Sequence, residues 1–220
     1  MHVLTAIKEL KKPVFTTRDV AAYCRSSLSN TIQALVCLEK KGIVIKIARG
    51  IWGFEFGREK ITPYAVIPYL MQSHRVYVSF VSALHLHGII EQIPQTMTLA
   101  STSHTKTINT KVGTYFIHRI APAFFKGFDW YKGDGNFLIA EPEKALVDCL
   151  YLSARKSKQF AHFPEMRFSA SFSMKKAERW AKAIPDKKIR VSVLKKLKDM
   201  MTEASPRPRL ARRSLEKGIK

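Results

Sequence analysis

The residues best suited to chemistry lie in the stretch EPEK, Glu141 to Lys144, which places two carboxylates and one ammonium group within four positions. Together with Asp134, this set resembles the acids and lysine that hold a divalent cation in a metal-dependent nuclease. In such a site the second acid and the lysine lie on one face of a strand, one residue apart. Here Glu143 and Lys144 are adjacent, so the match is poor.

The same stretch also has a structural interpretation. Pro142 suits the first position of a helix, and the flanking acids complement the positive end of the helix dipole. Asp148 follows Lys144 by four residues, within reach of an ion pair. We therefore expect a structural helix over residues 142–153, and we keep a metal-dependent nuclease or other nucleic-acid-processing enzyme as the alternative hypothesis.

Other catalytic or metal-binding signals are weak. His85 and His87 are two residues apart, whereas helical metal pairs are three or four residues apart. The chain lacks a phosphate-binding glycine loop and a nucleophile elbow. The sequence therefore predicts a protein that is not an enzyme and that uses no metal and no cofactor.

The charge of the chain favours a polyanionic partner. There are 38 Lys and Arg against 17 Asp and Glu, a net charge of +21 with a pI near 10.1. Residues 155–220 carry 20 basic and 6 acidic side chains, about two thirds of the excess. Nucleic acid is the first candidate partner. An anionic membrane surface is the second, but no apolar run reaches the ~18 to 20 residues of a spanning helix, so we expect no membrane partner.

Two further features concern location and thiol chemistry. The N-terminus alternates charged and apolar residues without a signal-peptide core, which predicts a cytoplasmic protein. The three cysteines, Cys24, Cys37 and Cys149, are odd in number and lack CxxC spacing. We interpret them as buried thiols.

Residues 1–57 have the pattern of a winged helix-turn-helix DNA-binding domain. Apolar spacing and turn residues predict helices over residues 2–11, 17–24 and 28–41, followed by a hairpin of strands at 43–47 and 50–56. The third helix is the candidate recognition helix, and Gly42 ends it. Its inward-facing residues are predicted to be Leu28, Ile32, Leu35, Val36 and Leu38.

The candidate DNA contacts cluster on this domain. Small hydroxyl and carboxamide side chains near the start of a recognition helix suit base edges and phosphates in the major groove. The predicted helix contacts are Thr17, Arg18, Ser26, Ser27, Ser29, Asn30 and Gln33. Lys46 and Arg49 on the hairpin suit phosphate or minor-groove contacts. The serines and the asparagine are also typical helix caps, and both roles can hold together.

The rest of the chain completes an α+β fold, with a mixed α/β C-terminal domain that ends in basic helices. Within residues 58–155, the apolar pattern predicts a helix over 64–72 and a helix over 80–88 capped by Ser79. It also predicts several strands between 95 and 140, followed by the helix at 142–153. Residues 134 and 135 belong to a predicted tight turn.

Residues 156–203 form a basic helical extension, and residues 204–220 a flexible basic tail. In the extension, one helix with Ala177, Trp180, Ala181 and Ile184 inward precedes another over 186–201. Their outward cations are either a solvated face or a second DNA contact. The cations assigned to that second contact are Lys175, Lys176, Arg179, Lys187, Lys188, Lys195 and Lys196.

Three segments carry a resemblance to a known family. They are SFVSALHLHGIIEQIPQTMTLAST from Ser79, GTYFIHRIAPAFFKGF from Gly113, and LIAEPEKALVDCLYL from Leu138. They resemble the C-terminal region of AbiEi-type antitoxins, and the resemblance spans residues 61–153. Residues 79–88 and 140–148 are its most specific parts.

The resemblance implies a transcriptional regulator of a type IV toxin-antitoxin system associated with abortive infection and phage defence. In that family the winged helix binds promoter inverted repeats and represses its own operon. The C-terminal domain neutralises a nucleotidyltransferase-like toxin without a stable toxin complex. The expected partners are thus double-stranded operator DNA and the cognate toxin.

Overall fold

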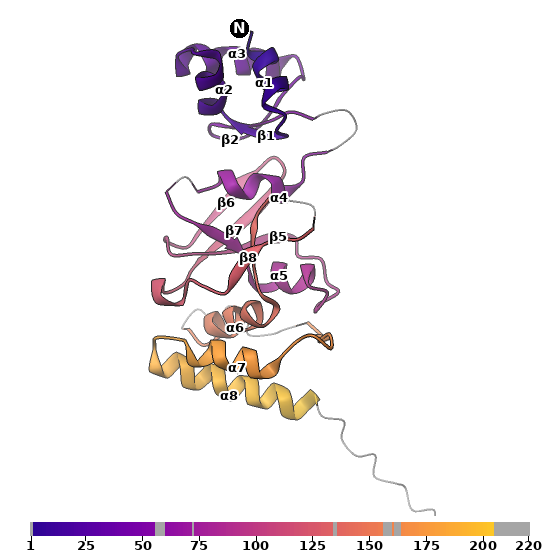
Figure 1. The fold of residues 1–220 in the computed structure, drawn as a ribbon, viewed down its shortest axis with the longest axis vertical. Coiled ribbons are helices and arrows are strands. Elements are labelled where there is room, and N and C mark those ends of the chain that lie inside the picture. Colours follow the sequence, from indigo (N-terminus) through magenta and orange to yellow (C-terminus); the bar gives the residue numbers. More distant parts are fainter. Residues whose placement is uncertain are drawn as a thin grey trace, which may run out of the picture.

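The computed structural model describes residues 2–55, 60–71, 73–133, 136–155, 160 and 164–204. Within these residues the fold is mixed α+β, with eight α-helices and two sheets. Figure 1 shows the layers in order: an N-terminal unit, a larger sheet, the helices α5 and α6, and finally α7 and α8. None of the helices in the described part of the chain has the length and apolar character needed to cross a bilayer.

The N-terminal unit combines three helices with a small antiparallel sheet of strand order β1-β3-β2. Its elements are α1 (Val3–Leu10), β1 (Val14–Thr16), α2 (Thr17–Cys24), α3 (Leu28–Lys40), β2 (Ile45–Ala48) and β3 (Ile51–Gly53). Apolar side chains from all three helices and the sheet share one core, formed by Ala6, Ile7, Phe15, Val20, Leu35, Val44 and Trp52. The predicted helices are therefore present, whereas the short strand β1 was not predicted.

Side-chain caps fix the starts of α2 and α3. The Thr16 hydroxyl accepts a hydrogen bond from the Asp19 backbone N–H at 3.1 Å, and the Asp19 carboxylate accepts the Thr16 N–H at 2.8 Å. This reciprocal pair is a capping box. Ser27 caps α3 by accepting the Asn30 N–H. Each cap satisfies a backbone N–H at the first turn of its helix, which would otherwise lack a partner within the helix.

The buried face of α3 differs from the prediction. Leu28 and Ile32 are 48% and 46% exposed, while Thr31 and Leu35 are fully buried. Thr31 can be buried because its hydroxyl donates to the Ser27 carbonyl at 2.8 Å. The buried row of the helix therefore runs one position to the side of the expected row. Cys37 also lies on the exposed side, so its assignment as a buried thiol was wrong.

The larger sheet has six strands in the order β6-β7-β5-β4-β9-β8. The strands are β4 (Val76–Val78), β5 (Thr96–Ser101), β6 (Lys106–Thr110), β7 (Gly113–Arg119), β8 (Phe128–Trp130) and β9 (Leu138–Ala140). Two neighbour pairs, β5 with β7 and β4 with β9, are parallel, and the others are antiparallel. The predicted turn at residues 134 and 135 lies outside the described residues, as does the predicted tail beyond residue 204.

The helix expected over residues 64–72 is shorter than predicted. It consists of α4 (Pro63–Val66) and the 3-10 helix η1 (Ile67–Tyr69). Pro68 has no backbone N–H and its ring clashes with the preceding turn, so an α-helix does not continue through it.

Four helices cover the sheet in two layers. α5 (Phe80–Leu86) and α6 (Pro142–Ser153) pack on the sheet and on each other, and α7 (Met174–Lys182) and α8 (Lys187–Ala204) pack on α6 (Figure 1). Ala177, Ala181 and Val193 on these last helices are fully buried in the same apolar core as the sheet. The basic helices thus complete the main core.

A buried polar network links α6 to β4 and to the start of α5. Lys144 and Asp148 are fully buried and form an ion pair. The second carboxylate oxygen of Asp148 accepts hydrogen bonds from Tyr77 Oη at 3.0 Å and Ser79 Oγ at 2.7 Å. Lys144 Nζ also donates to Tyr77 Oη at 3.1 Å. Each charged group therefore has several partners, which a buried ion needs.

Aromatic rings complete the surroundings of the lysine. The ammonium lies 3.9 Å from the centroid of the Phe124 ring, a cation–π contact. Gly127 lies close by with φ +79, and a Cβ there would be 2.7 Å from the Trp180 ring and 3.1 Å from Lys144 Cγ. Only glycine suits this position, because it tolerates the positive φ and leaves room for both side chains.

The N-terminal unit docks on the sheet through the β6–β7 turn. The Lys111 N–H donates to the Ile47 carbonyl on β2 at 3.3 Å, and Lys111 Nζ pairs with Glu39 on α3 at 2.9 Å. Ile61 packs against Gly53 so closely that any Cβ at Gly53 would collide with it. The two units are therefore in direct contact at two places, through Lys111 and through Ile61.

The first prediction concerns the buried ion pair. Asp148→Asn leaves the Lys144 ammonium without its counter-charge, so the free energy of unfolding should fall by about 3–5 kcal/mol. The double variant Lys144→Met with Asp148→Leu removes both charges and should cost far less than the sum of the two single changes. Urea denaturation of Asp148→Asn, of the single variants Lys144→Met and Asp148→Leu, and of the double variant measures this.

The matched control is the exposed pair Lys182 and Glu178, which has the same four-residue spacing. Lys182→Ala should cost less than about 0.5 kcal/mol, because surface ion pairs contribute little. Additive losses at Lys144 and Asp148 would contradict a coupled buried pair.

The second prediction concerns alkaline pH. Burial, reinforced by the Asp148 carboxylate, raises the pKa of Tyr77 well above its usual 10.0. Above pH 10 the unfolded tyrosine releases its proton while the folded one keeps it, so the folded state binds more protons and stability falls. The loss from this residue is up to about 1.4 kcal/mol per pH unit. Burial also lowers the pKa of Lys144. The unfolded lysine then holds its proton to higher pH than the folded one, so this residue makes stability rise with pH in that range.

The comparison of wild type with Tyr77→Phe isolates the tyrosine. Chemical denaturation at pH 9.5, 10.5 and 11 should show a shallower loss of stability in the variant. Equal slopes in the two proteins would rule out Tyr77 as a source of the alkaline loss.

Candidate nucleic-acid interface

The outward face of α3 carries polar side chains near its N-terminus. Ser29, Asn30 and Gln33 are all exposed, as the sequence predicted. Ser29 and Gln33 are four residues apart and therefore share one side of the helix. Hydroxyl and carboxamide groups in this position supply the donors and acceptors that read base edges in a major groove.

Exposed aliphatic side chains accompany these polar groups. Leu28 and Ile32, which were predicted to face inward, lie on the exposed side of α3. Ile32 is three residues after Ser29 and next to Gln33, so it belongs to the same surface. An aliphatic group there suits the methyl group of thymine, the apolar feature of the major groove.

Two of the predicted DNA contacts near α2, Thr17 and Ser26, are less exposed than predicted. Thr17 is buried, and its hydroxyl accepts the indole N–H of Trp52 at 2.9 Å. Its prediction as a DNA contact was wrong, because this hydrogen bond joins α2 to β3 inside the core. Ser26 is half-buried in the turn, where its N–H donates to Ala21, whereas Ser27 and Arg18 are exposed.

The β2–β3 hairpin carries exposed cations. Lys46 lies on β2, with its ammonium 5.7 Å from the centroid of the Trp52 ring. Arg49 is exposed in the turn, where Gly50 has φ +74. Lys111 and, more weakly, Lys46 lower the pKa of the Glu39 carboxyl near the end of α3. The hairpin therefore lies beside the C-terminal half of α3.

A shallow hollow of about 360 Å³ lies between this hairpin and the larger sheet. On one side it is lined by Lys46 and Arg49, and on the other by Asn109 and Thr110 at the end of β6 and by Lys111 in the β6–β7 turn. Cationic and amide side chains around such a hollow suit a phosphate group. Sequence reasoning missed the second side, because no local pattern shows that the β6–β7 turn docks on the hairpin.

The basic side chains of α7 and α8 divide into two groups. Lys196 donates to the Ser153 hydroxyl at 2.9 Å, and Lys176 pairs with Glu141 at 3.1 Å and Glu143 at 3.4 Å. These two lysines join helices to one another, so we no longer assign them to the second DNA contact. The remaining predicted cations are exposed: Lys175, Arg179, Lys187, Lys188 and Lys195.

The stretch EPEK has structural contacts at each charged position. Glu141 accepts the Trp180 indole N–H at 3.1 Å, and Glu143 accepts the Ser173 backbone N–H at 2.9 Å. Partial burial by itself lowers the pKa of Lys176, but the carboxylates of Glu141 and Glu143 outweigh it, so the pKa is raised. Lys144 instead pairs with Asp148 in the core. The two acids and Lys144 thus serve different partners, and Asp134 lies outside the described residues.

The two histidines of the α5 region, His85 and His87, have different surroundings. His87 Nε2 lies 2.8 Å from the Ala140 carbonyl, whereas His85 Nδ1 is buried and has no hydrogen-bond partner among the described residues. No group of three or more potential metal ligands occurs among the residues that the structure describes.

Comparisons with known proteins add no family assignment. No protein-family model matches the chain, and no curated protein matches it significantly.

The third prediction concerns how α7 is held. Glu143→Ala removes the acceptor of the Ser173 N–H and one partner of Lys176, which should destabilise the docking of α7 by about 1–3 kcal/mol. Hydrogen–deuterium exchange should then become faster in α7 and α8 and remain unchanged in β5 and β7. Glu178→Ala, on the exposed side of α7, is the control. Unchanged exchange in α7 would show that Glu143 does not hold this helix.

Proposed function

We propose that this protein is a DNA-binding transcriptional repressor whose N-terminal unit is a winged helix-turn-helix. The observation that carries the proposal is the exposed polar face of α3, with Ser29, Asn30 and Gln33, beside the cationic β2–β3 hairpin. In this assignment α3 is the recognition helix and the hairpin is the wing.

The order of elements supports this proposal. Helices α2 and α3 are joined by a short turn in which Arg25 has φ +51, and a three-stranded antiparallel sheet packs beneath them. Tight pairing of two helices before a hairpin is the arrangement of winged DNA-binding units. The net charge of +21 supplies the long-range attraction to DNA.

The contacts divide into two kinds in this proposal. Ser29, Asn30 and Gln33 read base edges, and Ile32 packs against thymine methyl groups. Ser26 and Ser27 at the turn, Arg18 on α2, and Lys46 and Arg49 on the wing contact the sugar-phosphate backbone. Such contacts fix the register of the protein on the duplex without reading sequence.

The exposed cations of α7 and α8 provide a second backbone contact in this proposal. These helices lie at the opposite end of the molecule from α1–α3 (Figure 1), so one protomer presents its two cationic surfaces to separate stretches of DNA. Two protomers on an inverted repeat then hold or bend the operator cooperatively.

The proposed biological role follows from the resemblance of residues 61–153 to AbiEi-type antitoxins. In that role the protein is a cytoplasmic, non-enzymatic autorepressor of a toxin-antitoxin operon that acts in phage defence. It neutralises a nucleotidyltransferase-like toxin without forming a stable complex. This part of the proposal rests on the sequence resemblance alone, and a nucleotidyltransferase-like reading frame beside the gene would support it.

The fourth prediction separates base reading from backbone contact. Gln33→Ala should relax the preference for one base pair by about 1–3 kcal/mol. Lys46→Ala should weaken binding to all sequences alike and reduce the slope of log affinity against log salt by about 1. Fluorescence anisotropy with a selected operator duplex and a random duplex, over a salt series, measures both effects.

The controls are exposed residues of the same types elsewhere, Gln92→Ala and Lys132→Ala. Neither should change the base preference. Equal losses on operator and random DNA for Gln33→Ala would contradict its role in base reading, and DNA binding without any sequence preference would overturn the repressor itself.

A further inference from the structure

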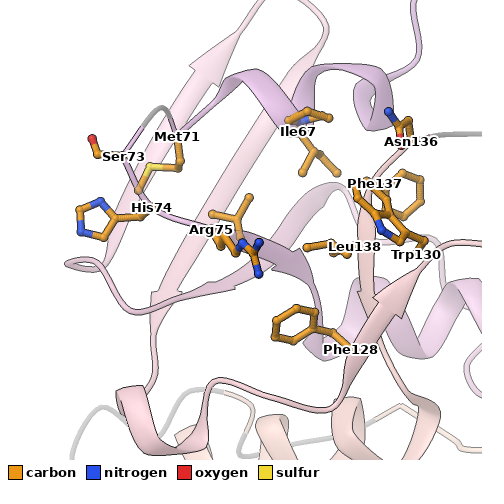
Figure 2. Close-up of a pocket in the computed structure, with 12 residues that line it drawn as sticks. Ile67, Met71, Ser73, His74, Arg75, Phe128, Trp130, Asn136, Phe137 and Leu138 are labelled. Atoms are coloured by element: carbon orange, nitrogen blue, oxygen red, sulfur yellow. The ribbon is translucent and has the colours of Figure 1, made fainter.

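A second hollow lies beside the opposite edge of the larger sheet. It has a volume of about 500 Å³ and is formed between η1, the chain that leads into β4, and the strands β8 and β9 (Figure 2). Because β6 and β8 are the two ends of the strand order, this hollow and the one at the wing lie at opposite edges of the sheet. Its volume is within the range of sites for small molecules.

The walls of this hollow are largely apolar, and one aromatic ring is left in solvent. Ile67, Phe137 and Leu138 contribute apolar surface, while Trp130 at the end of β8 is 59% exposed. Burying an indole ring is strongly favourable, so an exposed one beside a concave apolar wall indicates a surface that receives a flat apolar group. The other tryptophans differ, since Trp52 is buried and Trp180 half-buried.

The polar side chains of this hollow can all donate hydrogen bonds, and that of Arg75 is donor-only and positively charged. Arg75 extends from the chain before β4 toward the wall formed by β8 and β9 (Figure 2). His74, Ser73 and Asn136 add N–H and O–H groups along the rim. None of the described residues that line the hollow is acidic. A guanidinium group that faces a concave apolar wall suits an anionic ligand, and its planar fork matches phosphate oxygens.

We propose that this hollow binds a mononucleotide, with the base stacked on Trp130 and the phosphate held by Arg75. A nucleotide combines the two features that complement these walls, a flat ring for Trp130 and an anionic group for Arg75. A peptide is less suitable, because strand addition to β8 finds only three residues, Phe128–Trp130. A DNA duplex does not offer its bases to a pocket, since they are stacked and paired. The site is independent of the proposed DNA interface.

Calorimetry with the full chain tests this site, using adenosine monophosphate, uridine monophosphate, adenosine and inorganic phosphate as ligands. Each monophosphate should bind at least ten-fold more tightly than adenosine or phosphate alone, and should quench the fluorescence of Trp130. Arg75→Gln should weaken the monophosphates about ten-fold and leave adenosine unchanged. Trp130→Ala should weaken both nucleotides and adenosine.

Arg119→Gln and Tyr23→Ala, an exposed arginine and an exposed aromatic ring elsewhere, are the matched controls and should bind as wild type does. Absence of heat with every monophosphate would overturn the proposal. So would equal binding by wild type, Arg75→Gln and Trp130→Ala, because the nucleotide would then occupy another cationic surface. Much tighter binding of a single-stranded tetranucleotide would also overturn the proposal, because the ligand of the hollow would then be a nucleic-acid strand.

Discussion

The structure depends on one buried ion pair, between Lys144 and Asp148 on α6. Both side chains are fully removed from water, and such charges are tolerated only when partners surround them. Those partners are Tyr77 on β4 and Ser79 at the start of α5. The pair therefore fixes how α6 sits on the sheet, and the apolar core forms around that arrangement. Immediately before it, Glu141 and Glu143 hold α7 from the other side of the same helix.

This arrangement explains how distant parts of the chain are positioned. Helix α6 lies between the sheet and the C-terminal helices, so its charged residues connect both layers (Figure 1). At the other side of the sheet, Lys111 connects the β6–β7 turn to β2 and α3. The β2–β3 hairpin, with its exposed cations Lys46 and Arg49, is thereby held beside the larger sheet. The proposed DNA-binding surface therefore includes side chains of two units, because Arg49 and Asn109 line the same hollow.

Sequence reasoning predicted the elements well where the pattern is local. The helices and the hairpin of the N-terminal unit follow from apolar periodicity and caps, and the spacing of Lys144 and Asp148 already indicated a pair. It did not show that this pair is buried, because Tyr77 and Ser79 precede the helix by more than 60 residues. Long-range contacts of this kind leave no local signal.

The errors in the candidate site have the same origin. Thr17 was assigned to DNA although Trp52, 35 residues later, takes up its hydroxyl. Ile32 was placed inward because an aliphatic side chain on an amphipathic helix is usually buried, whereas Thr31 takes that place with its hydroxyl satisfied locally. Lys176 was assigned to a second DNA contact, whereas in the structure it pairs with the carboxylates of Glu141 and Glu143 at the start of α6.

Binding of the full chain to the DNA upstream of its own gene, compared with a scrambled duplex of equal length across a salt series, tests the central claim most directly. The proposed repressor prefers the upstream duplex, and this preference persists at physiological salt. Equal affinity for the two duplexes that disappears as salt rises would contradict it, because that behaviour needs only the net charge of +21.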